Sequence, residues 1–444
     1  MNRSSLFIVA AGACLAAAPS MAQQASPNQL QGPDKGTAEA APAEPGAKPA
    51  PARRKDRRVG KLHDQLRGQK KADDKDLNEA TPSDPYAGYL HFKKELESAT
   101  GVTYQLQPGV MWQWGAPNGG SNAAQFLWTP SLNWDMFDND RVGQGSIQIG
   151  YTYNNYWTRP TGVTMSNRLN VLSQINDSAA NTYNFSTLTY THVFPGNLLQ
   201  VTVGQYGFGN FDSNQYAGNQ LTNFVNYALS QNGSQSYVPD SLGGYVQINP
   251  TDTIAIAGGG QNAENITGDY IQANGVFNAP WAWFVYGQWT PTLPFLPASQ
   301  SSQYSLVVYD QPSVPQQPVS SIGWSANAVQ NLNANWGLFA RANHSTGPIS
   351  PIATSIAGGV AYNNPFNFGK KDQIGVGLAW NATNMSAYAG QAVRSSETVA
   401  EAYYNHVFFK VLQVGPDVQV IFNPALYPHA GTAEVFTFRI TGLI

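Results

Sequence analysis

Short segments with alternating apolar and polar residues recur through most of the chain. The last one, EVFTFRITGLI, places Phe436, Phe438 and Ile440 two residues apart, with Thr437 and Arg439 between them. In an extended strand, this spacing puts the apolar side chains on one face and the polar side chains on the other. The pattern therefore predicts an all-β protein. The same alternation is found at residues 147–153, 199–203, 374–380 and 418–423.

Two kinds of β protein have such strands. A soluble sandwich or β-helix buries the apolar face in a core and carries charge outside, whereas a transmembrane barrel turns the apolar face to lipid and the polar face to water. From Tyr86 to Ile444 there are only 28 charged residues in 359, with a net charge of −6. Ordinary globular domains are about one quarter charged. The scarcity of charge favours the transmembrane barrel.

Hydropathy and aromatic content agree with a barrel. The mean hydropathy of −0.31 is too low for a helical membrane protein, and no apolar run after the leader approaches the ~18 residues of a membrane-spanning helix. All 11 tryptophans follow residue 111, and the chain has 22 tyrosines, which suits aromatic girdles at the membrane interfaces. At ~22 residues per strand and connection, residues 86–444 predict a transmembrane antiparallel β-barrel of about 16 strands.

The N-terminus is typical of an export signal. Arg3 gives the positive start, LFIVAAGACLAAA the apolar stretch, and residues 20–22 a small-residue cleavage site, so residues 1–22 are predicted to be removed. Cys14, the single cysteine, lies in the apolar stretch. We interpret it as part of the removed signal rather than as a lipidated residue. The mature protein would then have neither disulfides nor thiol chemistry.

Residues 23–85 are rich in proline, alanine and charge. Such a composition buries too little apolar surface to offset the entropy lost on ordering. We expect a mostly disordered periplasmic linker, with a short helix near residues 61–69. The basic run over residues 53–71 could contact anionic envelope polymers or lipid head groups, or serve as a solvated spacer.

The sequence has no recognisable catalytic or metal-binding motif. The six histidines are scattered, without the spacing of a metal site, and neither a phosphate loop nor a nucleophile elbow is present. The formal net charge of −3 does not point to nucleic acid. We therefore expect no cofactor, no metal and no enzymatic activity. An outer-membrane hydrolase with dispersed catalytic residues is the alternative in this class.

A resemblance to a known family is carried by residues 203–229, 237–262, 336–366, 396–425 and 435–444. From about Tyr86 onward, the chain resembles the carbohydrate-selective porins of the OprB family. This resemblance implies a 16-stranded outer-membrane barrel that lets small sugars of the glucose type diffuse passively through a water-filled pore. The chain departs from the family in lacking its usual Trp-Gly-Gly element and in ending on Ile444 rather than Phe.

Strand parity identifies candidate residues of the pore lining. A charge on the lipid face would cost roughly 2–4 kcal/mol at mid-membrane, so charged residues fix which face of a strand turns inward. This argument selects Arg341, Glu401 and Arg439 as charged lumen residues. Sugars offer hydroxyl groups and apolar C–H faces, which suit polar side chains next to aromatic platforms. The remaining candidates are the platforms Phe339 and Tyr403 and the amides Asn343 and Asn405.

Other solutes and other protein classes remain open from the sequence. Selectivity depends on a few residues, so a general or other-solute porin is the nearest alternative. A secreted carbohydrate-binding or adhesive β protein would share the alternating strands. The expected partners are sugars in transit and outer-membrane lipid, with monomer and trimer both open.

Overall fold

The computed structural model describes residues 57–444, apart from 82–83, 118–120, 213, 267, 269–270, 274–275, 277–279, 294–301 and 430. The predicted signal peptide, Cys14 and the first part of the predicted linker lie outside the described residues. The boundaries of 1–22, 23–85 and 86–444 therefore stay predictions.

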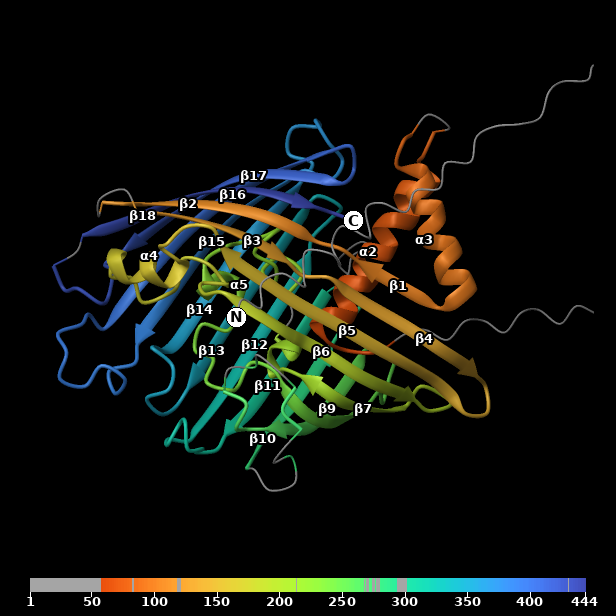
Figure 1. Cartoon of the computed structure of the whole chain (residues 1–444), viewed down its shortest axis with the longest axis horizontal. Helices are drawn as coiled ribbons and strands as arrows, with labels where there is room; N and C mark the ends of the chain where they lie inside the picture. The colour runs from red at the N-terminus through yellow and green to blue at the C-terminus, as the bar shows by residue number, and fades with distance from the viewer. Residues whose placement is uncertain are drawn as a thin grey trace, which may run out of the picture. The chain divides into compact units, whose positions relative to one another are not determined.

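The described strands form one closed antiparallel sheet. Its 18 strands join edge to edge, and β18 pairs with β2 to close the circle. β1 pairs with β4 and β2 pairs with β3, and both pairings follow the same register. β3 and β4 also pair with β5 in the same register. β1 and β2 therefore form one wall strand with a short interruption, and so do β3 and β4. The wall is a 16-stranded antiparallel barrel, as predicted (Figure 1).

The strands follow one another around the barrel in the order of the sequence. They are β1 (Val102–Gln105), β2 (Pro108–Ala116), β3 (Ser121–Trp128), β4 (Ser131–Asn139), β5 (Gly143–Tyr156), β6 (Thr182–Val193), β7 (Leu199–Tyr206), β8 (Ser241–Ile248), β9 (Ile254–Asn262), β10 (Trp281–Trp289), β11 (Ser302–Gln311), β12 (Ser321–Asn331), β13 (Trp336–Ser345), β14 (Ile352–Asn363), β15 (Gln373–Thr383), β16 (Ser396–Phe408), β17 (Leu412–Phe422) and β18 (Thr432–Gly442).

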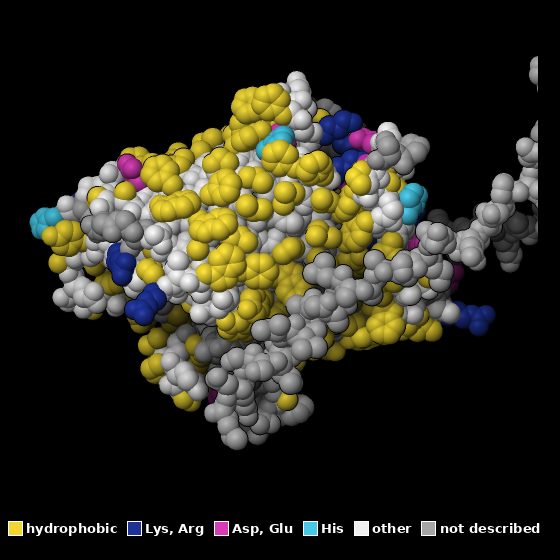
Figure 2. All heavy atoms as spheres, turned by 45° about the horizontal axis from the view of Figure 1, so that its top comes forward, with side chains coloured by type: hydrophobic (Ala, Val, Ile, Leu, Met, Phe, Trp, Pro, Cys, Tyr) yellow, Lys and Arg dark blue, Asp and Glu magenta, His cyan; other side chains and the backbone are white. Residues whose placement is uncertain are grey.

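Burial alternates along the strands as the sequence pattern predicts. On β15, Val376, Leu378 and Trp380 are 48%, 58% and 42% exposed on the outer face. On β18, Phe436 is half exposed while Arg439 is fully buried. Figure 2 shows the resulting outer wall, with apolar side chains over most of it and few charges. This is the surface that a lipid bilayer covers in a transmembrane barrel.

The two ends of the barrel differ in their connections. At one end, called the short-turn rim, strands are joined by turns such as residues 140–142 and 409–411. At the other end, called the long-loop rim, the longest connections are residues 157–181 and 207–240. We call these the first and second inward loops. They contain α4 (Gly162–Leu169), the 3₁₀ helix η1 (Phe208–Phe211) and α5 (Tyr227–Ser230).

Two helices precede the barrel wall and lie at the short-turn rim (Figure 1). They are α2 (Lys61–Asn78) and α3 (Ala87–Thr100), and both belong to the same compact unit as the barrel. The helix expected near residues 61–69 is therefore present but twice as long. The prediction of a mostly disordered linker is wrong for residues 61–78, because they form a helix and its His63 and Leu66 are buried. Among the described residues, no helix is long and apolar enough to cross a membrane.

Candidate functional site in the barrel lumen

Arg341 holds the second inward loop inside the barrel. It projects inward from β13 and is 1% exposed. Its guanidinium donates to the carbonyl oxygens of Gln231 at 2.8 Å, Ala217 at 3.0 Å and Leu229 at 3.3 Å. Its Nε lies 3.6 Å from Oδ1 of Asp212 in the same loop. One buried side chain therefore satisfies backbone acceptors across most of the loop.

Two inward carboxylates on β16 bind the backbone of the two loops. Glu401 accepts hydrogen bonds from the amides of Val225 and, at 2.9 Å, Asn226 in the second inward loop. Glu397, four residues earlier on the same face of β16, accepts from the amides of Leu172 and Ser173 in the first inward loop, both at 2.7 Å. The strand thus fixes both loops through two residues.

Arg439 on β18 completes this set. Its guanidinium donates at 2.6 Å to the carbonyl oxygen of Gln220 and also to that of Asn223. It donates to Oδ1 of Asn405 at 3.3 Å, and the amide nitrogen of Asn405 in turn donates to the carbonyl oxygen of Thr222 at 2.7 Å. These contacts hold the middle of the second inward loop against β16 and β18.

The two aromatic candidates pack against the same loop. Phe224 inserts between them, with ring centroids 5.2 Å from Phe339 and 5.0 Å from Tyr403. Asn343 accepts a hydrogen bond from the amide of Ser234 at 3.0 Å. Phe339 and Tyr403 are therefore covered by a loop side chain and present no open face to the lumen.

All seven residues selected from strand parity face the barrel interior, and none is more than 4% exposed. The structure gathers them around the second inward loop, where their polar atoms bind protein groups. Whether they touch a solute stays a prediction.

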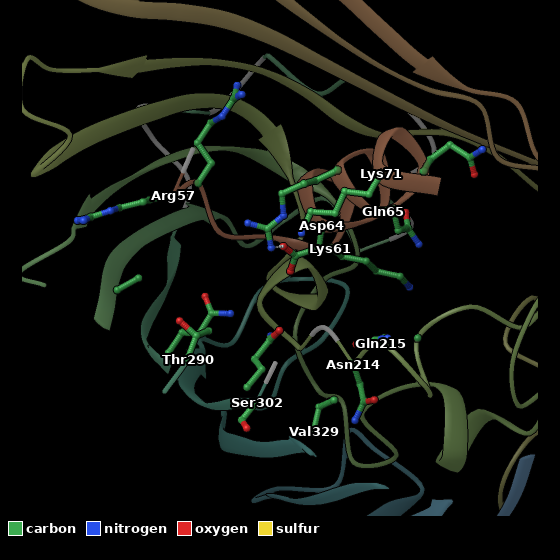
Figure 3. A pocket seen from close by; sticks show the side chains of 18 of the residues that line it. Arg57, Lys61, Asp64, Gln65, Lys71, Asn214, Gln215, Thr290, Ser302 and Val329 are labelled. Carbon is green, nitrogen blue, oxygen red and sulfur yellow. Dashed lines mark hydrogen bonds and ion pairs between the residues drawn. The ribbon is translucent and has the colours of Figure 1, made fainter. Parts of the chain in front are cut away.

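A chamber of about 770 Å³ lies in the other half of the lumen, toward the short-turn rim (Figure 3). The first half of α2 forms one side. The opposite sides come from the second inward loop, the turn over residues 249–253 and the inner face of β10 to β12. Figure 3 shows Lys61, Asp64 and Gln65 on the helix across from Asn214, Thr290 and Ser302.

The segment before α2 enters the lumen and is fixed there by buried polar contacts. Arg58 donates to Oγ of Ser146 at 2.6 Å and to Oδ1 of Asn133 at 3.1 Å. The side-chain amide of Gln247 accepts from the amide of Val59 and donates to the carbonyl oxygen of Arg57. The start of α2 therefore lies inside the barrel.

The turn into α2 depends on glycine. Gly60, the N-cap residue, has φ 127° and ψ 146°, a backbone conformation that is essentially confined to glycine. The turn reverses the chain inside the lumen, so the helix runs back toward the short-turn rim.

Ion pairs hold the far end of α2 and the segment that follows it at the short-turn rim. Lys410 contacts Asp84 at 2.6 Å and Lys370 contacts Glu79 at 2.8 Å, while Lys371 pairs with Asp76. The hydrogen bond from Lys410 lowers the pKa of Asp84, and the hydrogen bond from Lys370 lowers that of Glu79. Both carboxyl groups are thus better partners when ionised.

The chamber lining is mostly amide and hydroxyl groups, with charge from α2, from Arg57 and Arg58 before the helix, and from Asp252 in the turn over residues 249–253. Burial lowers the pKa of the Lys61 ammonium, and the carboxylate of Asp177 opposes that effect. Across the described residues, no cluster of three or more His, Cys, Asp or Glu side chains could hold a metal ion. The uncharged lining side chains with hydrogen-bonding groups are Gln65, Gln69, Gln105, Gln107, Asn214, Gln215, Asn219, Thr222, Asn223, Asn249, Thr251, Thr253, Gln288, Thr290, Thr292, Ser302 and Gln303.

The sequence interpretation did not identify the α2 residues of this site. Charge and proline near residues 50–60 indicate a linker, and the basic run over residues 53–71 is expected from the sequence to contact anionic envelope polymers or lipid head groups or to be a solvated spacer. A signal was present in the i, i+4 spacing of Leu62 and Leu66, which marks an apolar helix face.

Comparison with known proteins identifies relatives along most of the chain. A family model described as carbohydrate-selective porin, OprB family, matches residues 158–268 and 285–442. Porin AaxA of Chlamydia pneumoniae is 32% identical over 353 residues, covering 78% of this chain and 80% of the relative. Porin AaxA of Chlamydia felis is 32% identical over 359 residues, with 79% of each chain covered.

A solved structure shares the fold. The high-pH structure of Pseudomonas putida OprB superposes with a TM-score of 0.62 at 16% identity, covering 80% of this chain and 97% of that one. The expected resemblance, barrel fold and channel class are confirmed by these relatives, which are porins and not enzymes.

Proposed function

Because the chain belongs to the OprB family of carbohydrate-selective porins, we propose that it lets small carbohydrates of the glucose type diffuse passively across the outer membrane. The protein is an outer-membrane porin. Transport would follow the concentration gradient and would need neither a cofactor nor an energy source.

The chamber lining is the observation that carries this proposal. Its amide and hydroxyl groups come from α2, the second inward loop and the wall strands, so they surround the space from several sides. Amides and hydroxyls both donate and accept hydrogen bonds, which matches the hydroxyl groups of a sugar. A volume of about 770 Å³ lies within the range of about 300–1,000 Å³ typical of small-molecule sites.

The mechanism would be weak, distributed binding. A channel conducts best when binding favours entry but still permits release. Many neutral hydrogen-bonding groups spread over the chamber can replace the hydration of a sugar without one dominant contact. The two inward loops would provide the constriction, and the residues that hold them, including Arg341 and Glu401, would set its width.

One observation favours a second candidate, a general diffusion porin. None of the chamber-lining residues that the structure describes is aromatic. The described lining therefore offers no aromatic platform for the C–H face of a sugar, and polar solutes of similar size could use the same hydrogen-bonding groups.

Liposome swelling with the purified full chain would separate the two candidates. The solutes are glucose, a disaccharide and a neutral amino acid of similar size to glucose. We expect faster entry of the sugars, slowed by Gln288→Ala and Gln303→Ala in the chamber but not by Gln391→Ala, an exposed loop residue. Equal entry of all solutes would support the general porin. No entry with correctly inserted protein would contradict both.

A further inference from the structure

The charges that line the chamber are predominantly positive. Ion pairs account for part of them: Arg57 pairs with Asp252, and Arg67 pairs with Asp64 within α2. Arg58 pairs with Asp135 on β4, outside the lining. The lining cations are Arg57, Arg58, Lys61, Arg67 and Lys71, and the lining carboxylates are Asp64 and Asp252.

Lys61 and Lys71 are the lining cations left after this pairing. Within the described part of the chain, neither ammonium has a hydrogen bond or an ion pair, although Lys61 feels the fields of Asp177, Asp212 and Asp240. Each of those carboxylates is already engaged. Their partners are Gln231 for Asp177, Arg341 and Ser325 for Asp212, and Asn184 for Asp240.

The helix adds positive potential at the same place. α2 begins at Lys61 inside the lumen, and no side chain caps its first amides. The start of a helix carries roughly half a positive charge from its aligned peptide dipoles. Asp64 in the first turn offsets part of this potential, but its carboxylate is paired with Arg67. The inner end of the chamber thus combines the start of a helix with an ammonium that lacks a partner.

We propose that the chamber prefers small polyhydroxylated anions, that is, sugar acids with a carboxylate, over neutral and cationic sugars of the same size. Lys61 binds the carboxylate in the chamber and Lys71, on the exposed side of α2, attracts it at the entrance. The amide and hydroxyl lining binds the hydroxyl groups. This inference rests on the proposed sugar channel and names the charge of its preferred solute.

The test compares three solutes of one size and different charge: gluconate, glucose and glucosamine. The full-length protein is placed in planar bilayers, and zero-current potentials are measured in gradients of potassium chloride, potassium gluconate and glucosamine hydrochloride. Glucose entry is followed separately by liposome swelling. We expect anions to permeate better than cations, and gluconate better than glucosamine.

Substitutions at the two lysines test their assignment. Lys61→Gln should lower the preference for gluconate about fivefold, the effect of one unit charge about 4 Å away in water. Lys61→Glu should reverse it toward glucosamine. Lys71 is exposed, so Lys71→Glu should shift the preference toward glucosamine without affecting folding. Lys75→Gln, on the same helix but outside the chamber lining, is the matched control and should change nothing.

The outcomes distinguish this inference from the proposed function. Glucose entry with equal permeation of gluconate and glucosamine would overturn the charge preference and leave the sugar channel standing. An anion preference that survives both Lys61→Gln and Lys71→Glu would overturn the role of these lysines. Inserted protein that passes no glucose and no ions would contradict the proposed channel itself.

Discussion

The two halves of the lumen use inward-facing charge in different ways. Toward the long-loop rim, Arg341, Glu401 and Arg439 are buried and bind the backbone of the second inward loop. Toward the short-turn rim, Lys61 and Lys71 line an open chamber without hydrogen bonds among the described residues. The comparison teaches that facing away from lipid does not make a charge part of the solute path. An inward charge that binds a loop holds that loop in place, whereas an inward charge without a protein partner can act on a solute.

Arg341→Ala should have the largest effect, because it releases the second inward loop in the half of the lumen toward the long-loop rim. It removes the ion-pair partner of Asp212, which keeps its hydrogen bond from Ser325, and leaves several loop carbonyl oxygens without a donor. Loss of one partner of a buried pair typically costs about 3–5 kcal/mol. We expect the folded band on semi-native gels to be lost at a lower temperature and single-channel conductance to rise as the loop leaves the lumen. Arg141→Ala, at an exposed turn residue, is the control. Unchanged thermal stability and conductance would show that the loop is held by other contacts.

Arg58→Met should change the half of the lumen toward the short-turn rim, because it releases the start of α2. Its hydrogen bonds to Ser146 and Asn133 are charge-assisted, and each such bond contributes roughly 1.5–3 kcal/mol. We expect the chamber to open toward the short-turn rim and conductance to increase, with the thermal stability of the barrel nearly unchanged. Lys75→Met should leave conductance at the parent value. A loss of barrel stability equal to that of Arg341→Ala would remove the distinction between the halves.

Glu401→Gln and Glu397→Gln sharpen the comparison by separating the two inward loops. An amide in place of either carboxylate keeps the shape but weakens the bonds to backbone amides, at about 1–3 kcal/mol. Each residue binds a different loop, but Ser173 of the first loop donates a hydrogen bond to Asn226 of the second. The two losses of thermal stability should therefore differ from additivity by about 0.5–3 kcal/mol. Semi-native gels of the single and double variants would measure this. Additive losses would show that the two loops are held independently.

Acidification should weaken the ion pairs of the short-turn rim. The pKa values of Asp84 and Glu79 are lowered in the folded protein, so their ion pairs stabilise α2 above the ordinary carboxyl pKa of about 4 and are lost as the pH falls through the lowered values. Conductance recorded from pH 6 down to pH 3 should rise at the acid end. Lys410→Met should flatten this change, and a rise of the same size in that variant would exclude the Asp84 pair as its cause.

The wall could be predicted from the sequence because it obeys one rule. Strand alternation and the cost of charge in lipid assign Leu378 outward and Glu401 inward without knowledge of their neighbours, and the structure agrees. The inward loops could not be predicted, since residues 207–240 have no periodicity and their position depends on partners more than one hundred residues away. The helix α2 was hidden for another reason. Its charges suggested solvent, but the barrel supplies a partner for Asp76, and α3 supplies partners for Lys70 and Asp73.

The contacts of Arg341 also bear on how the protein loses its structure. Loops at the rim of a membrane barrel are often the regions that open at low free energy. Here the carbonyl oxygens of Ala217 and Gln231 accept hydrogen bonds from Arg341, a side chain of the barrel wall. The loop can therefore leave the lumen only if these buried hydrogen bonds break. Wall and loop therefore form one cooperative unit, and the interior of this barrel is expected to exchange its amide protons on the timescale of the wall itself.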